Sequence, residues 1–156
     1  MIKFFNLIII IFSISLSSLE QEYLSSQNKF SLLVHKTPTC GCCKKWVKHL
    51  EANSFSAMIK DHQNLQKVKE QYSIKPKYQS CHTAVSKEGY VFEGHIPSKF
   101  IKQFLVDPEA GAIGLSVPGM PLGSPGMEVE GRFMPYDVLV LYNDGSSKVF
   151  AEVRKL

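Results

Sequence analysis

Apolar positions along residues 30–53 change from a continuous run to a helical repeat. Residues 30–36 form an apolar run of strand length, and both faces are apolar in its middle, which is typical of a central strand. Pro38 ends this strand because proline cannot continue a sheet ladder. Residues 42–53 then carry apolar side chains at the i, i+3, i+4, i+7 spacing of an amphipathic helix, namely Cys43, Trp46, Val47 and Leu50. The pattern predicts a strand followed by a helix.

Similar strand-like and helical patterns of apolar residues continue as far as residue 105 and predict five more elements. These are a strand at 56–60, a helix at 64–72, two strands at 83–86 and 90–93 joined by a three-residue turn, and a helix that begins at Pro97. The resulting order is β-α-β-α-β-β-α, which is the thioredoxin-like layout of the α/β class. Because strand-helix-strand crossovers are parallel and right-handed and hairpin strands are antiparallel, we expect a mixed four-stranded sheet.

Beyond residue 105 the periodicity is lost and then returns. Residues 106–135 are rich in glycine and proline, and a loop of this length in a compact domain is usually either functional or disordered. Its apolar residues favour packing against the domain. Residues 136–153 show two strand-like segments on either side of an Asn-Asp-Gly-Ser turn, which predicts a β-hairpin. We therefore expect a single domain over residues 30–156.

The first residues have the layout of a secretion signal. Residues 1–17 contain one positive charge, an apolar core and then small residues, and residues 18–29 are a short polar lead-in. An uncleaved membrane anchor is the alternative, but the apolar stretch is shorter than the roughly 20 residues that span a bilayer. We expect export to the periplasm, cleavage of the signal peptide, and no stable membrane anchor in the mature protein.

Composition and charge narrow the classes of function. The chain has 156 residues, of which 44% are hydrophobic and 21% are charged, so it is long enough for one domain with a substantial core. The formal net charge of +4 comes from scattered lysines without a basic block, which argues against a nucleic-acid partner. Export would bring the thiols of the four cysteines into an oxidising compartment, where disulfides form and persist.

Three cysteines, Cys40, Cys42 and Cys43, fall on the turn between the first predicted strand and the first predicted helix. Such a turn favours thiolates, because the unpaired N–H groups and the positive dipole end of a helix stabilise negative charge. The fourth cysteine, Cys81, adjoins His82 in the loop that enters the third predicted strand. In the predicted layout this loop lies beside the N-terminus of the first helix, so we expect Cys81 and His82 to approach the cysteine turn.

These donors favour a soft-metal site. Thiolates and thioethers select Cu(I), thiolates also bind Zn(II), and imidazole serves both metals. Three thiols in one turn, together with Cys81 and His82, supply more soft donors than a redox couple needs, which favours a metal site for copper as Cu(I) or for zinc. The spacing Cys40-x-x-Cys43 is also that of a redox dithiol, which keeps thiol–disulfide chemistry open. Structural disulfides or inert thiols are the third interpretation.

Further candidates lie outside the cysteine turn. Pro-Gly-Met occurs twice in the long loop and presents the thioethers of Met120 and Met127, which are either supplementary copper ligands or packing residues. His82 is the strongest candidate among the histidines because it adjoins the fourth cysteine. His95 is either a ligand or a residue that leads into the third predicted helix.

Five blocks of sequence, in order, resemble the bacterial "domain of unknown function 411" family over about residues 32–149. They are Thr-Pro-Thr-Cys-Gly-Cys-Cys at 37–43 with Trp46, Ser-Cys-His-Thr-Ala at 80–84, Glu-Gly-His-Ile-Pro at 93–97, Gly-Leu-Ser-Val-Pro-Gly-Met-Pro at 114–121 and Gly-Ser-Pro-Gly-Met-Glu at 123–128. The resemblance implies an exported metal-binding protein associated with copper handling and resistance. It supplies no demonstrated reaction.

The resemblance assigns ligand motifs to Cys40, Cys42, Cys43, Cys81 and His82, and Pro-Gly-Met motifs to Met120 and Met127. The leading hypothesis is a module that binds Cu(I) and either sequesters it or hands it to another copper-handling protein, and we assign no catalytic residue. The alternative hypothesis is a periplasmic thiol–disulfide oxidoreductase with Cys40 as nucleophile and Cys43 as resolving thiol.

Overall fold

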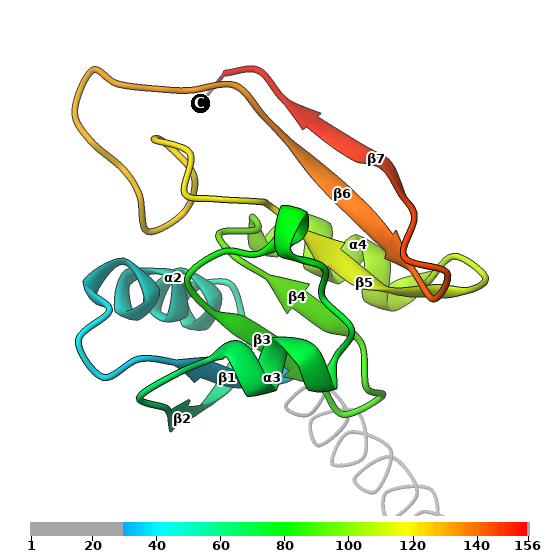
Figure 1. Cartoon of the computed structure of the whole chain (residues 1–156). Helices are drawn as coiled ribbons and strands as arrows, with labels where there is room; N and C mark the ends of the chain where they lie inside the picture. The colour runs from blue at the N-terminus through cyan, green and yellow to red at the C-terminus, as the bar shows by residue number, and fades with distance from the viewer. Residues whose placement is uncertain (1–29, 156) are drawn as a thin grey trace, which may run out of the picture. The chain divides into compact units, whose positions relative to one another are not determined.

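Seven strands form one mixed sheet within residues 30–155, the part of the chain that this computed structural model describes. The strands are β1 (Ser31–Lys36), β2 (Ser56–Asp61), β3 (Thr83–Ser86), β4 (Val91–Glu93), β5 (Ala112–Ser116), β6 (Tyr136–Tyr142) and β7 (Ser147–Val153). Their order across the sheet is β2-β1-β3-β4-β5-β6-β7 (Figure 1). The pairs β1–β2 and β4–β5 are parallel, and the other neighbouring pairs are antiparallel. The predicted signal peptide and lead-in at 1–29 lie outside the described residues.

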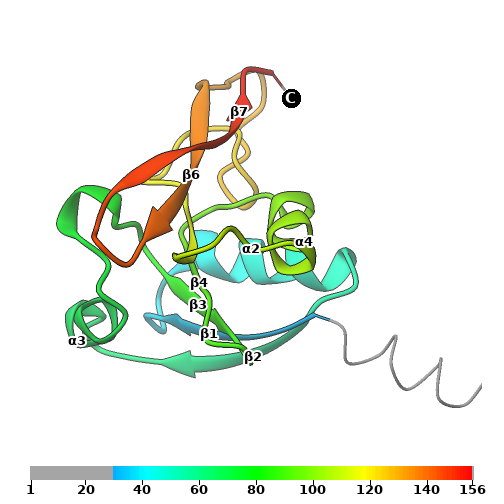
Figure 2. The ribbon, with the colours of Figure 1, turned by 90° about the vertical axis from the view of Figure 1, so that its right-hand side faces the viewer.

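Among the described residues, the helices are α2 (Gly41–Ala52), α3 (Gln66–Gln71), α4 (Ser98–Val106) and a 3₁₀-helix, η1 (Pro76–Tyr78). Helices α2 and α4 lie on one side of the sheet and α3 lies on the other (Figure 2). Helix α2 buries the four apolar residues whose spacing predicts it. No helix of residues 30–155 is long and apolar enough to cross a membrane.

The α/β class is confirmed, but the sheet is larger than the four strands that the sequence predicts. Strands β1 to β4 follow the predicted order along the chain, yet they do not form a separate thioredoxin-like sheet. Strand β5 arises inside 106–135, the segment predicted as a loop, and it joins β4 to the predicted hairpin of β6 and β7. The rest of this segment, 107–111 and 117–135, has no helix or named strand, apart from an isolated bridge between Val129 and Arg132.

A glycine explains why β5 does not stand out in the hydrophobic pattern. Gly114 interrupts the short apolar segment Ala-Ile-Gly-Leu-Ser and has a φ of +149°. A Cβ atom at Gly114 would lie 1.8 Å from the carbonyl oxygen of Val91, so β4 and β5 can pair this closely only with glycine at that position. Strand β5 therefore forms because β4 is beside it, and its own pattern of side chains is too weak to predict it.

The core holds the first turn of α2 in place. Trp46 is fully buried on the inner face of α2, and its Nε1–H donates a hydrogen bond to the carbonyl oxygen of Ile96 at 2.9 Å. Phe92 of β4 and Phe104 of α4 are also fully buried and contact each other edge to face. The hydrogen bond of Trp46 fastens α2 to the chain that leaves β4, and the contact between Phe92 and Phe104 packs α4 against β4.

Candidate metal centre

Cys40, Cys42 and Cys43 lie at the start of α2. Cys40 is the N-cap residue, and its Sγ accepts a hydrogen bond from the backbone N–H of Cys43 at 3.3 Å. Because residues three apart face the same side of a helical turn, the side chains of Cys40 and Cys43 meet. They form a disulfide, with Cα atoms 5.3 Å apart, whereas Cys42 and Cys81 are free thiols. The structure therefore shows the oxidised state of the centre.

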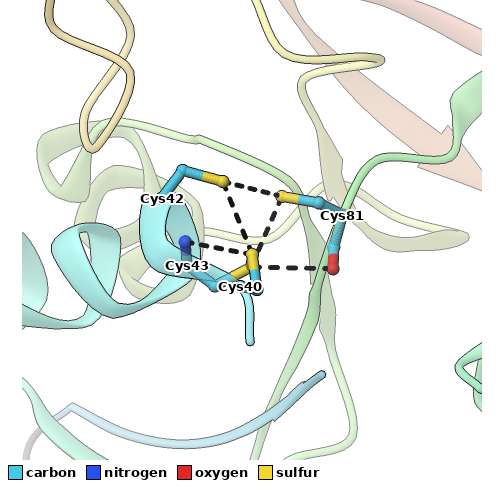
Figure 3. Close-up of side chains that lie close together, drawn as sticks. All are labelled: Cys40, Cys42, Cys43 and Cys81. Atoms are coloured by element: carbon cyan, nitrogen blue, oxygen red, sulfur yellow. Dashed lines mark hydrogen bonds between the residues drawn. A yellow bond between two sulfur atoms is a disulfide. The ribbon is translucent and has the colours of Figure 1, made fainter. Parts of the chain in front are cut away.

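Cys81 faces this turn from the loop before β3, as the predicted layout requires. Its Sγ lies 3.5 Å from Sγ of Cys43 and 3.8 Å from Sγ of Cys42 (Figure 3). The sulfur atoms of Cys42 and Cys40 are 3.4 Å apart. All four sulfur atoms lie within 4.8 Å of one another, so one metal ion could contact several of them. The four cysteines thus form a single cluster, which we call the cysteine cluster.

His95 lies on the other side of Cys81. Its Nε2 is 3.1 Å from Sγ of Cys81, and its Nδ1 is 2.8 Å from the carbonyl oxygen of Pro125. A carbonyl oxygen only accepts hydrogen bonds, so Nδ1 carries the hydrogen, and in the neutral ring the lone pair of Nε2 faces the sulfur. His95 is therefore arranged as a nitrogen donor next to Cys81.

His82 also contacts Cys81, through its Nδ1 at 3.3 Å from Sγ. The ring is fully buried and packs on Trp46, with ring centroids 4.3 Å apart. Its Nε2 has no hydrogen-bond partner among the described residues. The ligand atoms of Cys81, His82 and His95 lie within 4.8 Å of one another, so Cys81 belongs to both the sulfur group and a mixed sulfur–nitrogen group.

The register of one hairpin explains how His95 reaches Cys81. Thr83 pairs with Glu93 across the antiparallel strands β3 and β4. Two residues further toward the open end of the hairpin, Cys81 and His95 stand opposite each other. The three-residue turn predicted at 87–89 implies this register, so the pairing of Cys81 with His95 was within reach of sequence reasoning.

Burial sets the charge state of this part of the centre. It raises the pKa of the Cys81 thiol to about 12, with a further contribution from the nearby Cys42. It also lowers the pKa of His82 and of His95, so both rings are neutral at neutral pH. Cys81 is therefore a protonated thiol at neutral pH, and a metal ion would have to displace its proton.

The loop at 117–135 covers the start of α2. A Cβ atom at Gly126 would lie 2.7 Å from the carbonyl oxygen of Cys42 and 2.8 Å from the backbone nitrogen of Trp46, so only glycine allows this contact. Next to it, Met127 and Cys42 line the same open hollow, which has a volume of about 320 Å³. The hollow gives solvent a path to the cysteine cluster.

The two methionines differ in position. Met127 lines the hollow beside Cys42. Met120 is 52% exposed and is not among the residues that line that hollow. It follows Gly119, whose backbone N–H donates to the carbonyl oxygen of Gln79 at 3.1 Å. The structure thus places one of the two predicted thioethers, that of Met127, in the hollow beside Cys42, which we call the mouth of the cysteine cluster.

Comparisons with known proteins fit this geometry. The family described as "Protein of unknown function, DUF411" matches residues 78–127. Two solved structures of a copper resistance protein, copG forms 1 and 2, are 39% and 40% identical to this chain, and each has a TM-score of 0.75. The matches cover 81% and 80% of this chain and 98% of each copG chain. A comparison with curated protein sequences gave no significant match.

Proposed function

The chain belongs to the DUF411 family and is a homologue of the copper resistance protein copG, and on this premise we propose that it binds Cu(I) in copper resistance. The observation that carries the proposal is the cysteine cluster, with four sulfur atoms within 4.8 Å of one another. Thiolate sulfur is the donor that selects Cu(I) over harder metals. Zinc is the competing ion, because thiolates and imidazoles also bind it.

The proposed ligands are the thiolates of the reduced cluster. Two electrons and two protons convert the disulfide of Cys40 and Cys43 to thiols, after which Cys42 and Cys81 bring the number of thiols to four. Each thiol that binds the metal ion releases its proton. The Nε2 atom of His95, whose lone pair faces Cys81, is the nitrogen donor that the contacts favour.

The proposed place of action is the periplasm, and the proposed role is to sequester Cu(I) or hand it to another copper-handling protein. The location rests on the signal-like pattern of residues 1–17. The hand-off is supported by the hollow beside Cys42 and Met127, which leaves one side of the cluster open to solvent. A thioether at this mouth is a weak soft ligand that suits transient contact with Cu(I).

An anaerobic metal titration tests the proposal. The exported protein is reduced and titrated with Cu(I) against a competing chelator, and its free thiols are counted before and after. A parallel titration uses Zn(II). We expect Cu(I) to protect the thiols from alkylation and to bind more tightly than Zn(II). Thiols that stay fully reactive in the presence of Cu(I), or tighter binding of Zn(II), would contradict the proposal.

One observation favours a second function, a thiol–disulfide oxidoreductase. The disulfide of Cys40 and Cys43 lies at the N-terminus of α2, where a thiolate leaving group is stabilised. A substrate thiolate would attack Sγ of Cys40 and release Cys43 as a thiolate. The second substrate thiolate would then release Cys40 and leave as the substrate disulfide. In a reduced Cys43→Ser variant, the Cys40 thiolate would attack a disulfide substrate, form a mixed disulfide and release the other substrate sulfur as a thiolate. Accumulation of this mixed disulfide on Cys40 would support the function, and its absence would contradict it.

A further inference from the structure

A buried ion pair lies beside the loop that carries Cys81. Its members are Lys69 of α3 and Glu93, the last residue of β4, and their side chains are only 7% and 0% exposed. Such a pair adds little to stability, because the desolvation of both charges offsets their attraction. The hydrogen bonds that it makes to the rest of the chain are therefore the more informative feature.

The carboxylate of Glu93 accepts hydrogen bonds from both ends of a short segment, residues 80–83. Its Oε1 accepts from the Lys69 ammonium and from the backbone N–H of Ser80 at 2.6 Å. Its Oε2 accepts from the hydroxyl of Thr83 at 2.6 Å, and Lys69 also donates to this hydroxyl at 3.2 Å. Ser80 and Thr83 directly flank Cys81 and His82, so one carboxylate holds both sides of the ligand pair.

The same segment is tied to its surroundings at two more points. The backbone N–H of Gly94 donates to the carbonyl oxygen of His82 at 3.0 Å, and the hydroxyl of Ser80 donates to the carbonyl oxygen of Gly119. A Cβ atom at Gly94 would lie 2.6 Å from Cβ of Ser80, so the two chains are in close contact. Residues 80–83 are thus fixed from the end of β4 and from the start of the loop at 117–135.

We propose that Glu93 and Lys69 are positioning residues of the metal centre, which hold residues 80–83 so that the sulfur of Cys81 faces the cysteine turn of α2. Glu93 provides the hydrogen bonds, and Lys69 neutralises its charge in a site that excludes water. None of the contacts described for either side chain is to a proposed ligand atom. The inference rests on the proposed function, because it assigns a use to the position of Cys81.

The test compares two paired substitutions in the oxidised protein, where Cys42 and Cys81 are the two free thiols. Glu93→Leu with Lys69→Met removes both charges and the acceptor of the Ser80 N–H. Glu93→Gln with Lys69→Met removes the same charges but keeps an amide oxygen as acceptor. Iodoacetamide then labels each protein, and peptide mass spectrometry gives the rate for Cys81 relative to Cys42. This internal ratio cancels changes that affect the whole molecule.

We expect the ratio to rise about fivefold in the Leu/Met variant, which corresponds to about one lost hydrogen bond, and to stay within about twofold of the wild type in the Gln/Met variant. The control is Glu109→Leu with Lys148→Met, which removes an ion pair outside the cysteine cluster. An unchanged ratio in the Leu/Met variant overturns the proposal. An equal rise in the control also overturns it.

A milder variant covers the case in which the Leu/Met protein does not fold. Thr83→Val removes one hydrogen bond to Glu93 and keeps the ion pair. We expect a smaller rise of the ratio, and no rise would count against the proposal. Cu(I) affinity is measured on the same proteins after reduction. A wild type that does not bind Cu(I) contradicts the proposed function, whereas the labelling ratio reports the position of Cys81 without any metal.

Discussion

The two halves of the metal centre are built in different ways. The cysteine turn at 40–43 is local: four consecutive residues cap a helix, form a disulfide and border an open hollow. The half around Cys81 is assembled from distant segments, with His95 after β4, Glu93 at its end and Lys69 from α3. The first half follows from local helix geometry, and the second depends on contacts that join β3, β4 and α3.

The difference extends to chemistry. The turn presents its sulfur atoms at a helix N-terminus, where negative charge is stabilised. Cys81 is partly buried, with a pKa raised to about 12 and two neutral imidazoles in contact with it. The centre therefore combines sulfur atoms at a helix N-terminus with a thiol that stays protonated at neutral pH, although Cys42 and Cys81 are both partly exposed. We therefore expect substitutions on the Cys81 side to affect metal retention more than those at the mouth.

The strongest test of this asymmetry is Cys81→Ser. It removes the sulfur that contacts Cys42, Cys43 and His95, so we expect the Cu(I) affinity to fall about a hundredfold, which corresponds to about 2.7 kcal/mol. Cys42→Ser, at the open side, serves as the comparison and should cost less. Chelator competition gives the affinities, and circular dichroism checks the fold. Equal losses of affinity in the two variants would show that the two halves of the centre contribute equally to Cu(I) binding.

Lowering the pH should weaken Cu(I) binding, because the Cys81 thiol must lose its proton to bind the metal ion. Its pKa is about 12, so the thiol is protonated from pH 6 to pH 8 and releases one proton on binding the metal ion. We expect this proton release to make the Cu(I) affinity rise about tenfold for each unit of increase in pH, so binding is weaker at lower pH. Chelator competition at several pH values measures the slope of the logarithm of the Cu(I) affinity against pH. The Cys81→Ser substitution should reduce this slope by about one. A slope that the substitution leaves unchanged would exclude Cys81 as a thiolate ligand.

Gly126→Ala should displace the loop from the cysteine turn. The added Cβ would overlap the carbonyl oxygen of Cys42, and the φ of +87° is strained for alanine, so we expect a loss of about 2 kcal/mol in the free energy of unfolding. Gly131→Ala is the matched control, because its φ of +66° is also positive but nothing lies within 4 Å of the added atom. Urea unfolding measures the free energy of unfolding of both variants. Equal losses would mean that the contact between the loop and α2 does not contribute to stability.

The smallest effect is expected at the methionines. Met127→Leu keeps the volume but removes a thioether from the hollow beside Cys42, so Cu(I) should dissociate about threefold faster. Met120→Leu should leave the rate unchanged, because its side chain is half exposed and does not line that hollow. Stopped-flow transfer to a chelator measures both rates. Identical rates in the wild type and both variants would show that neither thioether takes part.

Local patterns accounted for much of the fold. The run at 30–36 and the helical repeat behind it match β1 and α2, and the hairpin at 136–153 matches β6 and β7. Strand β5 was missed because Gly114 weakens its pattern and because its pairing with β4 is decided by close backbone approach. The same strand turns the predicted four-stranded sheet into one of seven strands.

The sequence by itself determined the cysteine turn, the family and the approach of Cys81 to that turn, because each depends on short-range order or on the sequence of elements along the chain. Four cysteines allow three pairings, and only the folded chain selects Cys40 with Cys43. The predicted hairpin register already implies that His95 lies opposite Cys81, whereas only the tertiary structure decided that Glu93 and Lys69 hold the loop of Cys81. These choices depend on burial and on contacts between residues distant in sequence, which no local pattern records.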